Sequence, residues 1–216
     1  MRRPLTSILG IAILSLLSAG GSPAGVMIYA ADLDAEQVQP VGDNEDPLGS
    51  VAMGFARMEL DLDSLIISMS YEISFIGLSL EDDITAVHFH RGHREGARLP
   101  RHGVYGVNGP HVLNVYGFPR QDDDDLVVDL ENNTLRGIWD NTDRNFGPDG
   151  VYQPSDSVGL GEVVPDLFEE EIYIQVHTVN FPGGEIRGQL YLIPEPEGTA
   201  MIVIASCLTL LRRRRA

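Results

Sequence analysis

The chain has 216 residues, 32 acidic side chains and 15 basic ones, all of them arginine, for a formal net charge of −17. A surface this acidic repels polyanions and attracts cations, which argues against nucleic acid as a partner. The single cysteine, Cys207, has no second thiol in the chain with which to pair, which excludes a disulfide-based fold.

Residues 1–24 have the pattern of a secretory signal peptide. A pair of arginines precedes an apolar run at 5–17, and small residues follow it. We expect cleavage after Ala24, with Ala19 and Ala30 as alternatives. The other interpretation is a membrane-anchoring helix, but the run is shorter than the roughly 20 apolar residues that a span requires.

Residues 25–193 are expected to form one β-domain. Between 65 and 76 an apolar residue stands at every second position and most residues between them are polar, the period of a strand with one buried face. No long segment has helical periodicity. The fold class predicted is all-β, an antiparallel β-sandwich or Greek-key barrel of about seven or eight strands, flanked by N-terminal signal and C-terminal anchor helices. The predicted strands are 26–31, 51–62, 65–75, 85–90, 126–130, 134–139, 172–177 and 185–192.

The longest irregular segments are 91–109 and 141–166, and long loops in a compact domain are often functional. The first contains four arginines. The run Asp122 to Asp125 is interpreted as a solvated loop tip, with adventitious Ca²⁺ binding as the alternative.

His88 and His90 are two residues apart on a predicted strand, so their side chains share one face. With His111 and His177 they form a candidate metal site, because imidazole nitrogen is a preferred ligand of copper and zinc. The alternative is that hydrogen-bonded histidines merely stabilise a loop. No Ser-His-Asp order, phosphate-binding glycine loop or Cys-His pair indicates another chemistry.

The C-terminal segment, 194–216, resembles the PEP-CTERM sorting signal of bacterial exported proteins. It has a Pro-Glu-Pro motif, an apolar run at 199–211 and a terminal arginine cluster. The resemblance implies recognition by an exosortase-type processing enzyme, with the segment in the membrane before processing. A plain C-terminal anchor is the alternative. The residues that carry this signal are Pro194, Glu195, Pro196, Arg212, Arg213, Arg214 and Arg215.

Four motifs follow one another in the order typical of the CHRD domain, the module named from chordin. They are His-Phe-His-Arg-Gly at 88–92, Val-Asn-Gly-Pro at 107–110, Ile-Gln-Val-His-Thr at 174–178 and Pro-Gly-Gly-Glu-Ile-Arg-Gly-Gln-Leu at 182–190. The resemblance covers about 27–192. It implies a secreted β-sandwich that acts by binding rather than catalysis. We expect it in the cell envelope, at the cell surface or in the extracellular matrix, where its acidic surface suits cation-bridged contact with polysaccharide or envelope proteins.

The histidine segments are also similar to those of copper/zinc superoxide dismutase, in which matching histidines bind copper. That similarity implies His88, His90, His111 and His177 as ligands and Arg187 as a site-lining residue. The zinc-ligand set and the disulfide of that enzyme are absent from this sequence. Without 1–24 and 195–216, which hold six arginines and two glutamates, the net charge is about −21 and repels superoxide. We therefore expect a binding or structural protein rather than an enzyme, with a copper or zinc metalloprotein as the alternative.

Overall fold

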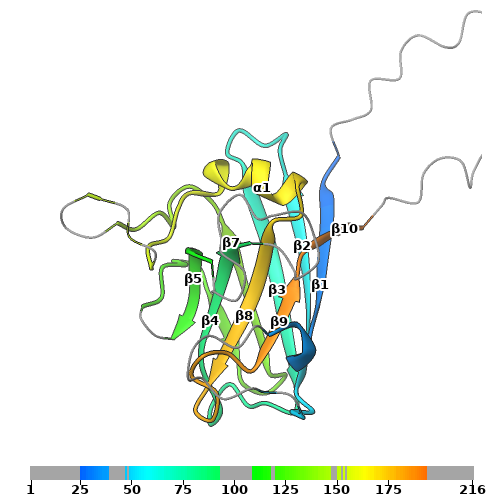
Figure 1. Ribbon diagram of the computed structural model, residues 1–216. Coiled ribbons are helices and arrows are strands. Elements are labelled where there is room, and N and C mark those ends of the chain that lie inside the picture. Colours follow the sequence, from blue (N-terminus) through cyan, green and yellow to red (C-terminus); the bar gives the residue numbers. More distant parts are fainter. Residues whose placement is uncertain are drawn as a thin grey trace, which may run out of the picture.

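The computed structural model describes residues 25–38, 47, 49–92, 109–117, 120–146, 150–151, 153 and 155–193. They form two antiparallel sheets packed face to face, as the all-β prediction required (Figure 1). The six-stranded sheet has the order β10-β1-β2-β3-β7-β6, and the four-stranded sheet has the order β5-β4-β8-β9. The strands are β1 Met27–Leu33, β2 Met53–Asp61, β3 Ser68–Ile76, β4 Ile84–Arg91, β5 His111–Gly117, β6 Val127–Asp129, β7 Thr134–Trp139, β8 Ile172–Thr178, β9 Ile186–Gln189 and β10 Tyr191–Ile193.

Helix is confined to short pieces within the described residues. Two 3-10 turns, η1 Ala35–Gln37 and η2 Leu160–Glu162, accompany one α-helix, α1 Val164–Phe168, which lies at one end of the sandwich (Figure 1). None of these is long and apolar enough to span a membrane. The helices expected within 1–24 and 194–216 lie outside the described residues.

The core fills the space between the two sheets. The inward residues of β3 are buried at every second position, as the alternation predicted, and the same is true of the C-terminal half of β2. Phe89 of β4 joins the layers, because its ring packs edge-on against Tyr71 and contacts Trp139, with centroids 5.9 Å and 5.4 Å apart. Trp139 is fully buried and donates its indole N–H to the Val158 carbonyl at 3.1 Å.

The predicted strand 185–192 is wrong as a single element. It is two strands in different sheets, β9 beside β8 and β10 beside β1, with Leu190 between them. The chain passes from one sheet to the other at a point of close approach. A Cβ on Gly188 would lie 2.7 Å from the Asp32 carbonyl oxygen of β1, so only glycine fits there.

The outer face of the four-stranded sheet is unusual because it is both polar and buried. All but one residue of β8 are buried, so Tyr173 and Gln175 are as inaccessible as the core residues that alternate with them. The neighbouring strands place His88, His90 and Arg187 on the same face, and each of these is at most 4% exposed. A buried polar face demands partners for its polar atoms.

Candidate metal centre

Three histidines converge on the outer face of the four-stranded sheet. His88 and His90 alternate along β4, and His177 extends from the neighbouring strand β8. One ring nitrogen from each lies within 4.8 Å of the others, and in the described part of the chain this is the one group of His, Cys, Asp or Glu side chains so arranged. Nitrogens at this separation can all reach a single ion at about 2.0–2.1 Å after small side-chain adjustments.

His111, at the start of β5, lies beside this trio. Its ring centroid is 4.1 Å from that of His88 and 4.5 Å from that of His90. The converging group of nitrogens does not include His111. We call the four residues His88, His90, His111 and His177 the histidine cluster.

Hydrogen bonds fix the tautomer of two rings of the cluster. Nδ1 of His90 lies 2.7 Å from the Gly109 carbonyl oxygen, and Nδ1 of His177 lies 2.9 Å from that of Pro182. A carbonyl oxygen only accepts, so each Nδ1 must carry the proton and each Nε2 a lone pair. Both Nε2 atoms are buried and have no hydrogen-bond partner.

Burial keeps these rings neutral. Desolvation is the largest cause that lowers the pKa of His90, followed by the proximity of His111 and His88. Desolvation also lowers the pKa of His111 and of His177, although their acceptors oppose the shift. Neutral imidazoles with inward lone pairs at pH 7 are the form in which histidine binds metal.

A stack of three side chains supports His90 from the next two strands. The Tyr173 ring of β8 is parallel to the His90 ring, with centroids 4.9 Å apart and an interplanar angle of 5°. The guanidinium carbon of Arg187, from β9, is 3.4 Å from the Tyr173 ring centroid. Because β8 lies between β4 and β9, the order across the sheet is His90, Tyr173, Arg187. Tyr173 also accepts the Gly109 N–H at 2.9 Å, so it contacts both His90 and the segment that supplies its carbonyl.

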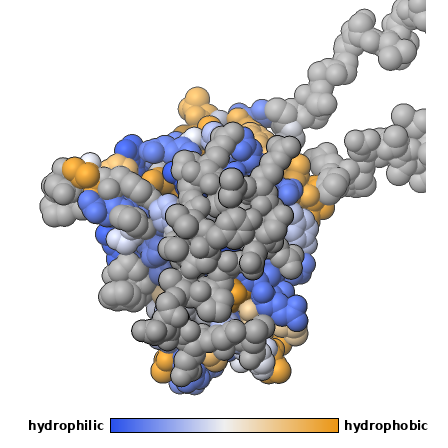
Figure 2. Space-filling view, viewed as in Figure 1, coloured by the Kyte–Doolittle hydropathy of each residue, from blue (hydrophilic) through white to orange (hydrophobic). Residues whose placement is uncertain are grey.

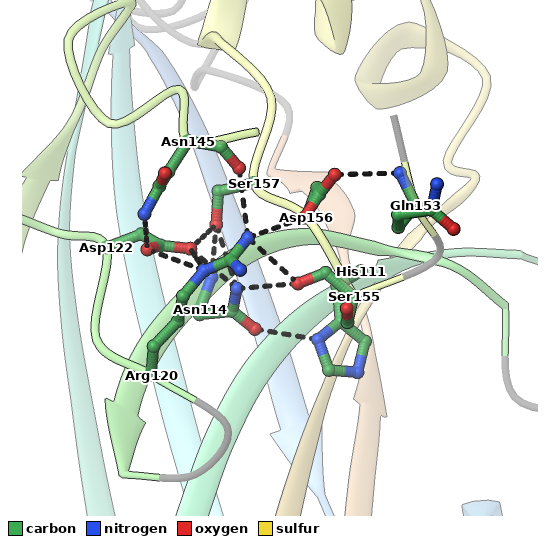
Figure 3. Close-up of polar contacts among 9 residues, drawn as sticks. All are labelled: His111, Asn114, Arg120, Asp122, Asn145, Gln153, Ser155, Asp156 and Ser157. Carbon is green, nitrogen blue, oxygen red and sulfur yellow. Dashed lines mark hydrogen bonds and ion pairs between the residues drawn. The ribbon is translucent and has the colours of Figure 1, made fainter. Parts of the chain in front are cut away.

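His111 is held by a different network, which Figure 3 shows. Its Nδ1 lies 2.7 Å from Asn114 Oδ1, and the Asn114 amide nitrogen lies 2.6 Å from the Asp122 carboxylate. Burial acts to raise the pKa of Asp122, but hydrogen bonds from Asn114, Ser157, Asn145 and Arg120 together lower it. Asp122 is therefore a buried, ionised carboxylate.

The prediction that Asp122 to Asp125 is a solvated loop tip is wrong for its first two residues. The Asp122 side chain is 0% exposed, and Asp123 is 1% exposed. The Asp123 carboxyl accepts the Tyr71 hydroxyl and the Asp125 N–H. Asp143, also 1% exposed, accepts the N–H groups of Asp140 and Asp124. We call Asp123 and Asp143 the carboxyl pair.

The residues predicted from sequence divide into three groups. The structure brings His88, His90 and His177 together, sets His111 against them, and places Arg187 one ring further away, over Tyr173. The sorting-signal residues at 194–196 and 212–215 lie outside the described residues. Sequence reasoning did not identify Tyr173, Asn114 or Asp122; for Tyr173 the signal was available, because it alternates with Gln175 and His177 on one face of β8.

The comparisons with known proteins agree with the motif order. The model of the CHRD domain family matches residues 29–190, which is most of the chain and includes all four residues of the histidine cluster. CHRD domains occur in secreted or extracellular proteins. No curated protein and no solved structure matches the chain.

Proposed function

The chain belongs to the CHRD domain family, and on this premise we propose that it is an exported binding protein whose histidine cluster holds a copper or zinc ion. The family supports a binding or structural role outside the cell. The chemistry of the cluster supports a transition metal as a ligand, because three imidazoles and no thiolate or carboxylate form the converging group.

One observation carries the metal proposal. The Nε2 atoms of His90 and His177 are buried and have no hydrogen-bond partner, and both residues belong to the converging trio. Burying a polar atom without a partner costs about 1–3 kcal/mol. A metal ion offsets that cost by accepting the lone pairs. Histidines that only stabilise a loop would use both nitrogens in hydrogen bonds.

The trio supplies three protein ligands, so a four-coordinate ion would have one coordination position that the trio does not fill. The ring of His111 lies next to the trio. Zinc sites with three protein ligands keep such a position for water or substrate. Copper(II) binds the same nitrogen set more tightly than zinc does, by the general order of divalent affinities. We expect one ion per chain, with copper bound more tightly than zinc.

The charge of the molecule favours binding over turnover of an anion. Residues 25–194 carry a net charge of about −21, which opposes the approach of superoxide and concentrates cations near the surface. The described surface on the face drawn in Figure 2 is a mosaic in which hydrophobic residues form small separate patches among hydrophilic ones. Such a surface fits hydrated, cation-bridged contact with extracellular polysaccharide or envelope proteins.

Calorimetry on the purified protein tests the metal proposal. Cu²⁺ and Zn²⁺ should each bind at one ion per chain, and the His88→Ala/His90→Ala double variant should lose this binding. The matched control is Arg57→Ala, which removes a half-exposed cation from the opposite sheet. A double variant with the stoichiometry of the unchanged protein would contradict the site.

The route of export is a separate part of the proposal. The basic and apolar N-terminus and the Pro-Glu-Pro, apolar and arginine segments support secretion followed by exosortase-type processing. N-terminal sequencing and intact-mass measurement of the protein from its native cells should show the loss of 1–24 and of the segment after Pro194. A cytoplasmic protein with both ends intact would contradict this route.

A further inference from the structure

The hydrogen bond of His111 differs from those of His90 and His177, because the side chain that its Nδ1 contacts can act as a donor or as an acceptor. His90 and His177 donate to backbone carbonyls, whose role as acceptors never changes. His111 instead contacts a side-chain amide, Asn114, whose oxygen and nitrogen ends can exchange places by rotation. The protonation of His111 therefore depends on what holds the amide of Asn114.

Besides the Ser157 hydroxyl at 3.2 Å, two groups that can only accept hold the Asn114 amide. Its amide nitrogen lies 2.6 Å from Asp122 Oδ2 and 3.0 Å from the Ser155 carbonyl oxygen. A carboxylate and a carbonyl oxygen both require a donor, so the end that faces them must be the NH₂ group. The Asn114 oxygen then faces His111, and the proton between them must belong to His111 Nδ1.

Asp122 is itself fixed in its ionised form by several donors. Besides Asn114, Ser157 donates at 2.6 Å, Asn145 at 2.6 Å and Arg120 at 3.0 Å (Figure 3). These partners come from three separate segments of the chain. The carboxylate is consequently an immobile acceptor at the far end of the relay Asp122, Asn114, His111.

We propose that Asp122 is a positioning residue of the metal centre, which acts through Asn114 to fix His111 in the Nδ1–H form. The His111 ring, 4.1 Å from that of His88 but with its nitrogens outside the converging trio, then becomes the fourth nitrogen ligand by moving toward the bound ion. This inference rests on the proposed metal function. Metal-binding histidines are commonly oriented in this way, by an outer partner that binds the nitrogen away from the metal. The relay leaves a lone pair on Nε2 of His111, as the carbonyl contacts do on Nε2 of His90 and of His177.

The first test uses the protein without metal. ¹⁵N NMR of the histidine rings should show His111 as the Nδ1–H tautomer in the unchanged chain. In Asp122→Asn the share of the Nε2–H tautomer should rise, because the Ser155 carbonyl oxygen still requires the Asn114 NH₂ group but the acceptor at 122 no longer does. Asp156→Asn is the matched control. Asp156 also accepts from Arg120, at 2.7 Å, and from the Gln153 N–H. His111 as the Nε2–H tautomer in the unchanged chain would overturn the relay.

The second test uses Cu²⁺. Loss of an outer partner typically weakens metal binding 10–100-fold, so Asp122→Asn should weaken Cu²⁺ binding about tenfold and His111→Ala at least as much. The two changes should not add when combined, since both act through the same ring. The Cu²⁺ electron paramagnetic resonance spectrum should change in both variants and stay unchanged in Asp156→Asn.

The outcomes separate this proposal from the one on which it rests. If the unchanged chain binds no metal, the proposed function fails and the ligand role of His111 fails with it. If Cu²⁺ binds at one ion per chain, but His111→Ala or Asp122→Asn leaves the affinity and the spectrum unchanged, the metal function stands and the relay is overturned.

Discussion

The histidine cluster and the carboxyl pair are both buried groups of ionisable side chains, and they differ in whether their polar atoms have hydrogen-bond partners. In the carboxyl pair every oxygen has a donor: Tyr71 and the Asp125 N–H for Asp123, and the N–H groups of Asp140 and Asp124 for Asp143. In the histidine cluster Nδ1 of His90 and of His177 has an acceptor, but Nε2 of each has no hydrogen-bond partner. Unsatisfied atoms that converge therefore mark a binding site better than buried charge does.

The two regions also shift their pKa values in opposite directions for one shared reason. Burial penalises the charged form, so it lowers the pKa of His90, His111 and His177 and raises that of Asp123 to about 6 and of Asp143 to about 7. Gly137 leaves room for the hydrogen bond between Tyr71 and Asp123. A Cβ on Gly137 would lie 2.4 Å from both Asp123 Oδ2 and the Tyr71 hydroxyl oxygen.

The largest expected difference between the regions is their response to metal. At a free Cu²⁺ concentration of 100 times Kd, binding to the folded state should raise the free energy of unfolding by about 2.7 kcal/mol. For a domain of this size that is a rise in Tm of several degrees. Thermal unfolding with and without Cu²⁺, and again after addition of a chelator, measures it. The rise in Tm with Cu²⁺ should be absent from the His88→Ala/His90→Ala variant and unchanged in Asp123→Asn. If Asp123→Asn also lost the rise, the response to metal would not distinguish the two regions.

The second prediction concerns pH and the carboxyl pair. Asp143 has a pKa of about 7 in the folded state against 3.8 in the unfolded one, so its favourable contribution is complete below pH 3.8 and is lost as pH rises through 7. Asp143→Asn removes this dependence. Relative to the unchanged protein, the variant should gain of the order of 2 kcal/mol between pH 4 and pH 8. Urea unfolding at several pH values measures the difference in free energy of unfolding between the variant and the unchanged protein. The histidines contribute equally to both, so their effect cancels. A difference that is the same at every pH would contradict the raised pKa of Asp143.

Tyr71→Phe should have a smaller effect. The phenylalanine ring keeps the edge contact with Phe89 but leaves the Asp123 carboxyl without its hydroxyl donor. Because that hydrogen bond lowers the pKa of Asp123, its loss raises the pKa further above 6. We expect a loss of about 1–2 kcal/mol at pH 8 and less at pH 5, where the carboxyl is protonated more fully. Urea unfolding at the two pH values is the measurement, and equal losses would count against an ionised partner.

The sequence predicted most strands, because alternation reports which face of a strand is buried. It did not predict β5, whose residues 112–115 are all buried and therefore show no alternation, and whose pairing with β4 contains two register shifts. It also did not predict the split at Leu190, because the transfer from one sheet to the other depends on tertiary contact with β1.

The candidate site was predictable where local spacing determines it. Alternation placed His88 beside His90, and His177 followed from the motif order. The supporting residues were not predictable, since Asn114 and Asp122 reach His111 through a loop contact rather than through strand period. The four-aspartate run had the composition of a solvated loop, and only the positions of Tyr71 and Asn114 explain why its first two members are buried.

The smallest expected effect lies at Tyr173, which joins the histidine cluster to its surroundings. Tyr173→Phe keeps the ring between His90 and Arg187 and removes the acceptor of the Gly109 N–H. The cost should be about 1 kcal/mol of stability, with a loss of Cu²⁺ affinity of less than tenfold, because Gly109 still accepts from His90. Tyr173→Leu is the control that removes the ring itself, and it should weaken Cu²⁺ binding more. Calorimetry on both variants compares them; equal losses would mean that the hydroxyl, rather than the stacked ring, holds His90 in place.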